Sequence, residues 1–216
     1  QSTQTVSPTL NSGILGLIDK YRSSQDFKIA SKFSKFVVLT HEDKEYWSNL
    51  SNITVIPNAN SFETEVKAPL DNKQVLAIGR FDYQKGFDDL IKVWGIVHRQ
   101  HPDWELKIYG HGPLEVQMKC MIDELKLNDS ITLIPPTKNI ENVYLESSIV
   151  AMTSRYEGLP MVLLEGQVCG LPLVSYACKC GPRDIIKDGV NGFLIENESK
   201  ELMAEKLSLL MRDSSL

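Results

Sequence analysis

From residue 74 onward, short runs rich in valine and isoleucine alternate with longer stretches whose apolar residues have helical spacing. The runs have strand length and are apolar at successive positions, which is typical of strands buried on both faces of a sheet. Such strands, alternating with helices, form a parallel sheet with helices on both faces. The sequence therefore predicts an α/β fold with a parallel sheet of about six strands, at residues 75–78, 105–109, 131–134, 149–153, 173–175 and 193–195.

The stretches between these strands predict helices. Within residues 87–97, the apolar side chains fall at positions 87, 90, 91, 94 and 97, which places them on one face of a helix. The predicted helices span residues 86–100, 114–127, 140–146, 160–169, 182–187 and 200–211.

A shorter alternation precedes this region. We expect an amphipathic stretch at residues 10–32 and strands at residues 36–39 and 53–56. Between the two strands, Thr40 and Asp43 form a capping-box start for a helix that ends near residue 50.

The early elements bury too little apolar surface for an independent core. They are followed by a polar stretch, residues 61–72, that has the composition of a linker. We therefore predict two parts. Residues 1–70 are the remnant of a first domain with its linker, and residues 71–216 are a second domain.

Composition excludes several classes of protein. The net charge of -5 and the isoelectric point near 5.4 argue against a nucleic-acid partner, which requires a basic face. No apolar run reaches the roughly 18–20 residues of a membrane span. The polar first residues lack the pattern of a signal peptide, and we interpret them as a cut end. Four cysteines are too few for a disulfide framework, so we expect a reducing cytoplasm.

A metal site is not expected. Cys178 and Cys180 are one residue apart, but a structural zinc site needs four ligands, and no second Cys or His pair has suitable spacing.

The loops that follow the predicted strands hold the unusual residues. Parallel sheets bind ligands at the carboxyl ends of their strands. The loop after the first strand holds two cations, Arg80 and Lys85. Pro160 suits the first turn of the helix that follows the fourth strand. A helix N-terminus with nearby cations is a site for phosphate.

Each of these features also has a simpler interpretation. The two cations could be ordinary surface charges, and the Gly110-x-Gly112 segment could be a turn. Glu157 could be an acid that favours the start of a helix. Glu165 lies in a mostly apolar helix, where an ionised group needs a partner. Its partner could equally be a cation of the protein, in a structural ion pair, or a hydroxyl group of a ligand.

Together, these motifs resemble glycosyltransferase family four, over about residues 34–212. The family's pair of glutamates is matched by Glu157 and Glu165, with seven residues between them. Its phosphate loop is similar to residues 79–86, and its other signatures are similar to residues 110–113, 157–160, 170–174 and 184–194.

The resemblance implies a GT-B fold of two Rossmann-like domains with the active site between them. This chain then looks like the C-terminal, nucleotide-sugar-binding half, truncated at both ends. Residues 1–70 look like the remnant of the N-terminal acceptor domain with its linker. The rest of that domain would be a missing partner, so we expect the fragment to be inactive alone.

The resemblance also assigns residues. Arg80, Lys85 and Glu157 are the expected catalytic residues. The cations would stabilise the leaving diphosphate without a metal or other cofactor. Glu157 would hold a hydroxyl of the donor sugar, and Glu165 would accept the two ribose hydroxyls. The expected substrate-binding residues are Gly79, Gly110, Gly112, Pro135, Gly158, Leu159, Pro160 and Glu165. Pro135 departs from the glycine that the family usually has where the base is received.

The implied enzyme is a retaining, hexosyltransferase-type glycosyltransferase. It would transfer a sugar from a UDP- or GDP-sugar to a hydroxyl of a glycan or lipid-linked acceptor, in bacterial surface-polysaccharide biosynthesis. We expect it in the cytoplasm, or peripheral at the inner face of the cell membrane when full-length.

Two alternatives remain. One is a non-catalytic module that binds nucleotide sugars. The other is an NAD-dependent dehydrogenase, but the loop after the first strand lacks the glycines of the dinucleotide motif.

Overall fold

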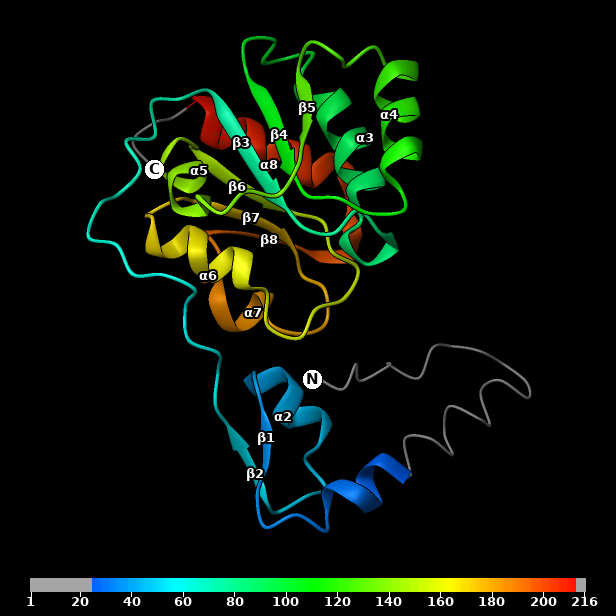
Figure 1. The fold of residues 1–216 in the computed structure, drawn as a ribbon, viewed down its shortest axis with the longest axis vertical. Coiled ribbons are helices and arrows are strands. Elements are labelled where there is room, and N and C mark those ends of the chain that lie inside the picture. The colour runs from blue at the N-terminus through cyan, green and yellow to red at the C-terminus, as the bar shows by residue number, and fades with distance from the viewer. Residues whose placement is uncertain (1–24, 213–216) are drawn as a thin grey trace. The chain divides into compact units, whose positions relative to one another are not determined.

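The computed structural model describes residues 25–212. The chain forms two compact units that divide after Asn58, and each is described by itself (Figure 1). The expected boundary near residue 70 lies inside the second unit. Residues 59–70 belong with that unit because they bond to it: Ala68 N donates to Cys169 O at 2.9 Å, and Lys67 Nζ donates to Val168 O at 2.5 Å.

The first unit contains two short parallel strands, β1 (Phe36–Val38) and β2 (Ile53–Val55), with helix α2 (His41–Tyr46) between them. The helix begins at its predicted residue, because Thr40 Oγ1 accepts a hydrogen bond from Asp43 N at 3.0 Å. Residues 25–30 are helical, while the earlier part of the amphipathic stretch lies outside the described residues.

The second unit contains the predicted sheet of six parallel strands. They are β3 (Gln74–Ile78), β4 (Glu105–Tyr109), β5 (Ile131–Ile134), β6 (Ile149–Met152), β7 (Leu173–Tyr176) and β8 (Gly192–Ile195). Their order across the sheet is β5-β4-β3-β6-β7-β8, and every neighbouring pair is parallel. This is the strand order of a Rossmann fold, so the predicted fold class is confirmed.

Helices cover both faces of this sheet (Figure 1). One apolar core lies under α3 (Phe87–Val97), α4 (Glu115–Glu124) and α8 (Lys200–Arg212). The other lies under α5 (Ile140–Leu145), α6 (Met161–Val168) and α7 (Pro182–Ile185). Successive residues of a strand point to opposite faces. Accordingly, Val75 and Ala77 enter the first core and Leu76 enters the second, all fully buried. No helix within residues 25–212 is long and apolar enough to cross a bilayer.

The strand order creates one switch point. From β3 the chain moves outward to β4 and β5, then crosses to β6 on the other side of β3 and moves outward again. The loops that follow β3 and β6 therefore leave the sheet in opposite directions. Such a point is where open α/β sheets bind ligands, at the carboxyl ends of the strands.

Candidate functional site

The loop after β3 is folded back on itself by a short 3₁₀ helix, η1 (Tyr83–Lys85). Asp82 caps this helix, because its Oδ1 accepts from Lys85 N at 3.2 Å. Gly86 then turns the chain into α3 in a left-handed conformation, with φ of 63°. A Cβ at Gly86 would lie 2.1 Å from Thr153 O, so glycine allows this loop to touch the end of β6.

Lys85 and Glu157, which are 72 residues apart in the sequence, meet at this switch point. Lys85 Nζ lies 2.6 Å from Glu157 Oε1, and the two side chains are 21% and 7% exposed. The stem of Lys85 lies over Gly79, where a Cβ would be 3.0 Å from the Lys85 Cγ and Cδ atoms. The structure therefore brings together a predicted cation, a predicted carboxylate and a predicted glycine.

Glu157 is fixed from its other side by the loop after β7. Glu157 N donates to Lys179 O at 2.7 Å, and Cys180 N donates to Glu157 O at 3.1 Å. Gly181, in the loop after β7, packs against the residues that follow Glu157 in the loop after β6, since a Cβ at Gly181 would lie 2.5 Å from Pro160 Cδ. The predicted segment 158–160 is thereby held between β6 and α6, with Pro160 at the N-cap of the helix.

Arg80 lies in the same loop as Lys85 but extends toward solvent. Its Nε donates to Asp82 Oδ2 at 2.5 Å, and its side chain is 66% exposed. The guanidinium is therefore accessible to a ligand that approaches the carboxyl ends of the strands.

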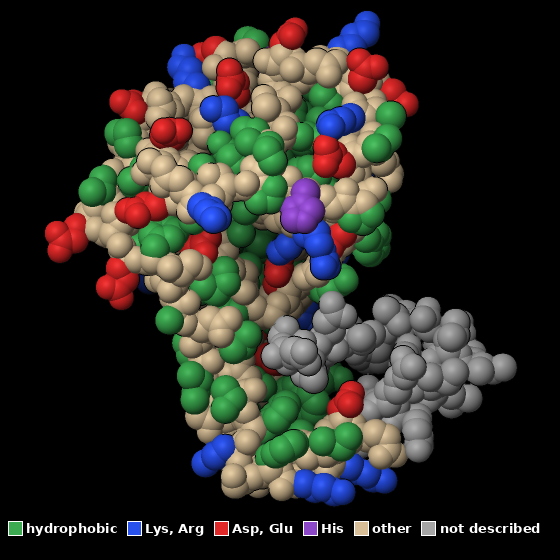
Figure 2. Space-filling view, in the orientation of Figure 1, with side chains coloured by type: hydrophobic (Ala, Val, Ile, Leu, Met, Phe, Trp, Pro, Cys, Tyr) green, Lys and Arg blue, Asp and Glu red, His purple; other side chains and the backbone are tan. Residues whose placement is uncertain are grey.

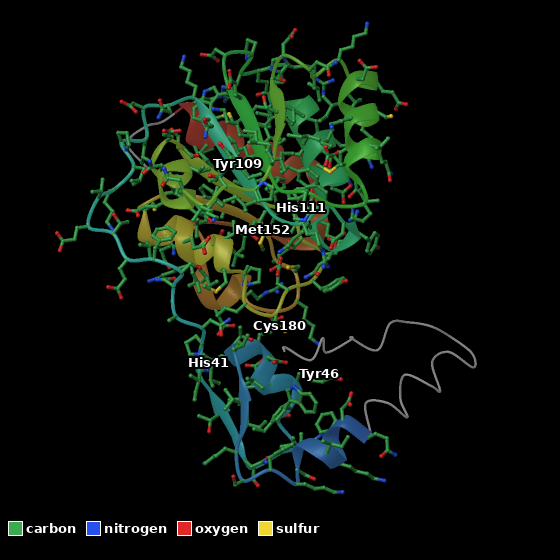
Figure 3. The ribbon with its side chains drawn as sticks, viewed as in Figure 1. His41, Tyr46, Tyr109, His111, Met152 and Cys180 are labelled. Carbon is green, nitrogen blue, oxygen red and sulfur yellow. The ribbon has the colours of Figure 1, made fainter. Side chains whose placement is uncertain are left out.

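Gly110 and Gly112 bring the loop after β4 against the loop after β3. A Cβ at Gly110 would lie 1.9 Å from Gly79 O, and one at Gly112 would lie 2.5 Å from Phe81 O. Phe81 N donates to His111 O at 2.8 Å between the two loops. In Figure 3, the labels of His111 and Met152 mark the carboxyl end of the strands.

Pro135 is exposed and follows β5, the outer strand of the sheet. It lies at the same end of the sheet as the other predicted residues, because Gly110 N donates to Ile134 O at 2.8 Å. Strand β4 lies between its strand and β3, so it is the predicted residue farthest along the sheet from the Lys85–Glu157 pair.

Glu165 is buried in α6, with 9% of its surface exposed, and two hydroxyl groups donate to it. Tyr144 OH donates to Oε2 at 2.6 Å, and Ser61 Oγ donates to Oε1. Burial raises the pKa of the Tyr144 hydroxyl, and the Glu165 carboxylate raises it further. Sequence reasoning missed Tyr144 and Ser61, which lie on α5 and on the segment that enters the second unit.

Arg155 was also missed. It follows β6, its side chain is 16% exposed, and its Nη2 lies 2.8 Å from Asp88 Oδ2. The hydrogen bond with Asp88 raises the pKa of Arg155. Burial alone would raise the pKa of Asp88, but the hydrogen bond and charge of Arg155 lower it below its ordinary value.

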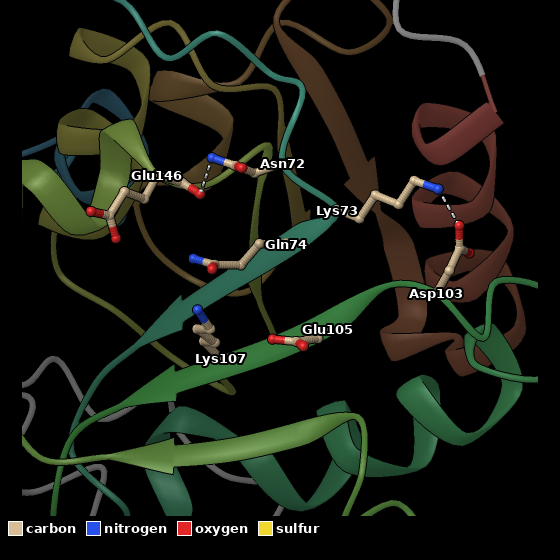
Figure 4. Close-up of a pocket in the computed structure, with 7 residues that line it drawn as sticks. All are labelled: Asn72, Lys73, Gln74, Asp103, Glu105, Lys107 and Glu146. Atoms are coloured by element: carbon tan, nitrogen blue, oxygen red, sulfur yellow. Dashed lines mark hydrogen bonds and ion pairs between the residues drawn. The ribbon is translucent and has the colours of Figure 1, made fainter.

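A separate polar hollow lies at the opposite, amino end of β3 and β4 (Figure 4). None of the predicted site residues lines it. Its lining residues are Asn72, Lys73, Gln74, Asp103, Glu105, Lys107 and Glu146.

The surface charge is mixed. On the face of the second unit drawn in Figure 2, Lys and Arg side chains lie among Asp and Glu side chains. Across residues 25–212, no three His, Cys, Asp or Glu side chains are gathered in the way a metal ion would require.

Comparison with known proteins adds to this geometry. Residues 59–216 match the family described as "Glycosyl transferases group 1". The amylovoran biosynthesis glycosyltransferase AmsD of Erwinia amylovora is 39% identical over 193 residues, with 84% of this chain and 54% of that protein covered. An uncharacterized glycosyltransferase of Haemophilus influenzae is 38% identical over 186 residues, with 84% and 53% covered. The chain therefore spans about half the length of these curated relatives.

A solved structure has the same fold over most of the chain. It is a mutant of TarM from Staphylococcus aureus in complex with fondaparinux, alpha-GlcNAc-glycerol and UDP. The TM-score is 0.81 at 27% identity, with 89% of this chain and 40% of that chain covered.

Proposed function

The chain belongs to the group 1 glycosyl transferases, and we propose that it is the donor-binding part of a retaining enzyme of glycosyltransferase family four. In this proposal the second unit is the C-terminal half of a GT-B fold and binds a nucleoside-diphosphate sugar. The observation that carries the proposal is the contact between Lys85 and Glu157 at the switch point of the sheet.

The diphosphate is proposed to bind beside Arg80, Lys85 and the first turn of α6. The first amides of a helix have no partners within the helix, and they attract anions. Arg80 supplies an exposed guanidinium, and Lys85 supplies an ammonium that is already held at the carboxyl end of β3. Together these groups present positive charge from two loops to one ligand.

The chemical difficulty lies in the leaving group. As the bond from the anomeric carbon to the diphosphate oxygen breaks, the electron pair stays on the oxygen and negative charge grows there. Positive groups placed in advance stabilise that charge. A charge-assisted hydrogen bond contributes about 1.5–3 kcal/mol, so two cations could lower the barrier by about 3–6 kcal/mol, or about 150- to 25,000-fold in rate.

This arrangement requires no metal ion in the proposed reaction. We expect transfer by the complete protein to continue unchanged in EDTA. Loss of activity in EDTA, with recovery on adding a divalent cation, would contradict this part of the proposal.

The two glutamates are proposed to bind different parts of the donor. Glu157 would hold a hydroxyl of the sugar next to the diphosphate. Glu165 would accept the two ribose hydroxyls, since the two oxygens of one carboxylate match a cis-diol. In the ligand-free chain these oxygens already accept from Tyr144 and Ser61, and a carboxylate has about four lone-pair sites, so Glu165 keeps sites for the ribose hydroxyls.

UDP or GDP is the proposed nucleotide, and a glycan or lipid-linked hydroxyl is the proposed acceptor. UDP is favoured by its presence with alpha-GlcNAc-glycerol in the TarM complex. A role in surface-polysaccharide synthesis is supported by the amylovoran relative. Because relatives are about twice as long, we propose that residues 1–58 are part of an acceptor domain, that residues 59–70 are a linker packed on the second unit, and that transfer requires the rest of the acceptor domain.

The complete protein is proposed to work in the cytoplasm, at the inner face of the membrane. Residues 27–41 contain three lysines and no acidic residue. Beside these lysines, Ile29 and Phe33 are 53% and 57% exposed. Lysines interspersed with exposed apolar side chains favour binding to an anionic bilayer surface. Sedimentation with anionic but not neutral vesicles would support this location, and equal binding to both would oppose it.

A thermal-shift screen tests the donor directly. UDP, GDP, their sugars and NADH would each be added to the chain. A ligand at about one hundred times its Kd stabilises the folded state by about 2.7 kcal/mol, which corresponds to a Tm increase of roughly 5–11 °C at this size. We expect a shift with UDP or GDP. A shift with NADH alone would favour the dehydrogenase alternative.

The chemistry is tested in the complete protein. Replacing both cations, Arg80→Ala with Lys85→Ala, should abolish transfer because the leaving diphosphate loses both partners. Retained transfer by this double variant would remove the leaving-group argument.

A further inference from the structure

Arg155 is a third cation at the switch point, but both of its terminal nitrogens already donate to the protein. Its Nη1 donates to Tyr83 O at 2.6 Å, and its Nη2 donates to Asp88 Oδ2 at 2.8 Å and to Asp89 Oδ2 at 3.4 Å. Its Cζ lies 4.3 Å above the centre of the Tyr83 ring. A guanidinium that is held in this way is a poor candidate for binding phosphate.

All of these partners belong to η1 or to the first turn of α3, so Arg155 connects the loop after β6 to the loop after β3. Further bonds join the same two loops. Arg155 N donates to Gln84 O at 2.8 Å, Gln84 Nε2 donates to Tyr156 O at 3.0 Å, and Thr153 Oγ1 donates to Gly86 O at 2.9 Å.

The residues that make these bonds flank Lys85 in the sequence. They fix the main chain at residues 83, 84 and 86, and Lys85 is the residue between them. On the other loop, Glu157 follows Arg155 by two residues. The distance between Lys85 Nζ and Glu157 Oε1 therefore depends on how firmly the two loops are joined.

We propose that Arg155 is a positioning residue that joins the loop after β3 to the loop after β6 and thereby keeps Lys85 at the switch point, where its ammonium meets Glu157 in the ligand-free chain and the diphosphate in the complex. The consequence for nucleotide binding rests on the proposed function. The positioning of Lys85 itself does not, because it concerns a contact within the ligand-free chain.

Arg155 also pairs with acids near the proposed diphosphate. Asp88 and Asp89 lie in the first turn of α3, directly after the loop that carries Lys85. Arg155 contacts both of them, and Lys200 Nζ lies 3.0 Å from Asp89 Oδ1. With these acids paired, Lys85 is directed to Glu157 rather than to them.

Lysine cannot replace the guanidinium here. A guanidinium is planar, donates in several directions at once and stacks on an aromatic ring, whereas an ammonium is a compact point charge. Arg155→Lys keeps the charge but should lose the simultaneous contacts with the Tyr83 carbonyl, the Tyr83 ring and Asp88.

The first test is a double-mutant cycle in the absence of nucleotide. Lys85→Ala, Glu157→Gln and the double variant are made in the wild-type chain and again with Arg155→Lys, and urea midpoints are measured. In the wild-type background, the cycle should give a coupling free energy of unfolding between positions 85 and 157. In the Arg155→Lys background, this coupling free energy should fall by at least half. Equal coupling in both backgrounds would overturn the proposal.

The second test is UDP titration by calorimetry. Arg155→Gln should weaken binding at least tenfold, and Arg155→Lys at least threefold. Lys92→Gln is the matched control, since its Nζ lies 3.8 Å from Asp89 Oδ1 but it removes no bond between the loops. Its affinity should stay within twofold of the wild type.

The outcomes separate the two ideas. If the wild-type chain fails to bind UDP or GDP, the proposed function fails, while the coupling measurement still decides the role of Arg155. If the wild type binds but Arg155→Lys binds equally well, the positioning role is refuted. If Arg155→Gln does not fold, Arg155→Lys alone gives the answer by the same criterion.

Discussion

The two glutamates should respond in opposite directions when each is changed to glutamine. Glu165 is proposed to bind the ribose, so Glu165→Gln should weaken the binding of UDP. Glu157 holds Lys85 in the ligand-free chain, so the diphosphate has to compete with it for the ammonium. Glu157→Gln should therefore strengthen the binding of UDP while it impairs transfer of the sugar.

The size of each effect follows from the contacts. In Glu165→Gln, one acceptor oxygen becomes a donor, and one ribose hydroxyl loses its partner. Hydrogen bonds to charged groups are worth more than neutral ones, so we expect a loss of about 1–3 kcal/mol, or about 5- to 150-fold in Kd.

For the other variant, the expected gain is smaller. Glu157 and Lys85 are 7% and 21% exposed, which makes their pair stronger than a surface pair but still accessible to water. Release of the ammonium and loss of a nearby negative charge should contribute about 1 kcal/mol, or about a fivefold lower Kd for UDP.

The assay is calorimetric titration of the chain with UDP and with its 2′-deoxy and 3′-deoxy analogues. The wild type should discriminate against both analogues, and Glu165→Gln should discriminate less because its ribose acceptor is impaired. Thermal unfolding checks that Tyr144, which donates to Glu165, remains packed. The reasoning is refuted if Glu165→Gln binds UDP within twofold of the wild type, or if both variants shift affinity in the same direction.

Three further predictions concern stability and reactivity. Gly110→Ala should lower Tm by several degrees, since overpacking costs about 1–3 kcal/mol. Gly95→Ala is the control and should not lower Tm, because a Cβ at Gly95 would make only ordinary van der Waals contact. Equal Tm values for the two variants would contradict the close approach of the strand-end loops. Because the pKa of Asp88 is lowered in the folded chain, its ionised form stabilises the chain above the ordinary value of 3.8. Asp88→Asn should therefore lower Tm at pH 7, with a deficit that shrinks as pH falls through the lowered pKa, and a deficit independent of pH would count against the ion pair. Cys169 is fully buried and burial raises its pKa to about 11, so a thiol reagent at pH 8 should modify exposed Cys120 first and Cys169 only on unfolding, as peptide mass mapping would show.

The strands could be predicted closely because their signal does not depend on distant residues. A strand buried on both faces has to be apolar along its length, and β4 and β5 have the predicted bounds. Helix ends were less predictable. The helix expected to reach residue 127 ends at Glu124, because Lys126 adopts a left-handed φ of 56° and Leu127 N turns back to Ile122 O. No glycine marks this turn in the sequence.

The partners of the site residues could not be predicted, because the fold brings them from far along the chain. The sequence left Glu165 with a structural ion pair or a ligand hydroxyl as equal alternatives. In the ligand-free chain, hydroxyl groups of the protein donate to it, from Tyr144, 21 residues away, and Ser61, 104 residues away, and neither could be foreseen from the sequence. Nothing in the sequence singled out Arg155, since its partner Asp88 is 67 residues earlier.

The strand order explains why motifs so far apart in the sequence can form one site. Residues after β3 and after β6 become neighbours only because β6 returns to the side of β3, after the chain has formed β4 and β5. In the ligand-free chain Lys85 and Glu157 form an ion pair at this point. Each charge therefore has a partner at a place that water reaches only in part. A bound diphosphate would take the ammonium and leave the carboxylate free to accept from a sugar hydroxyl. One exchange of partners would then prepare both the leaving group and the sugar, which makes the Lys85–Glu157 contact the resting form of the proposed active site.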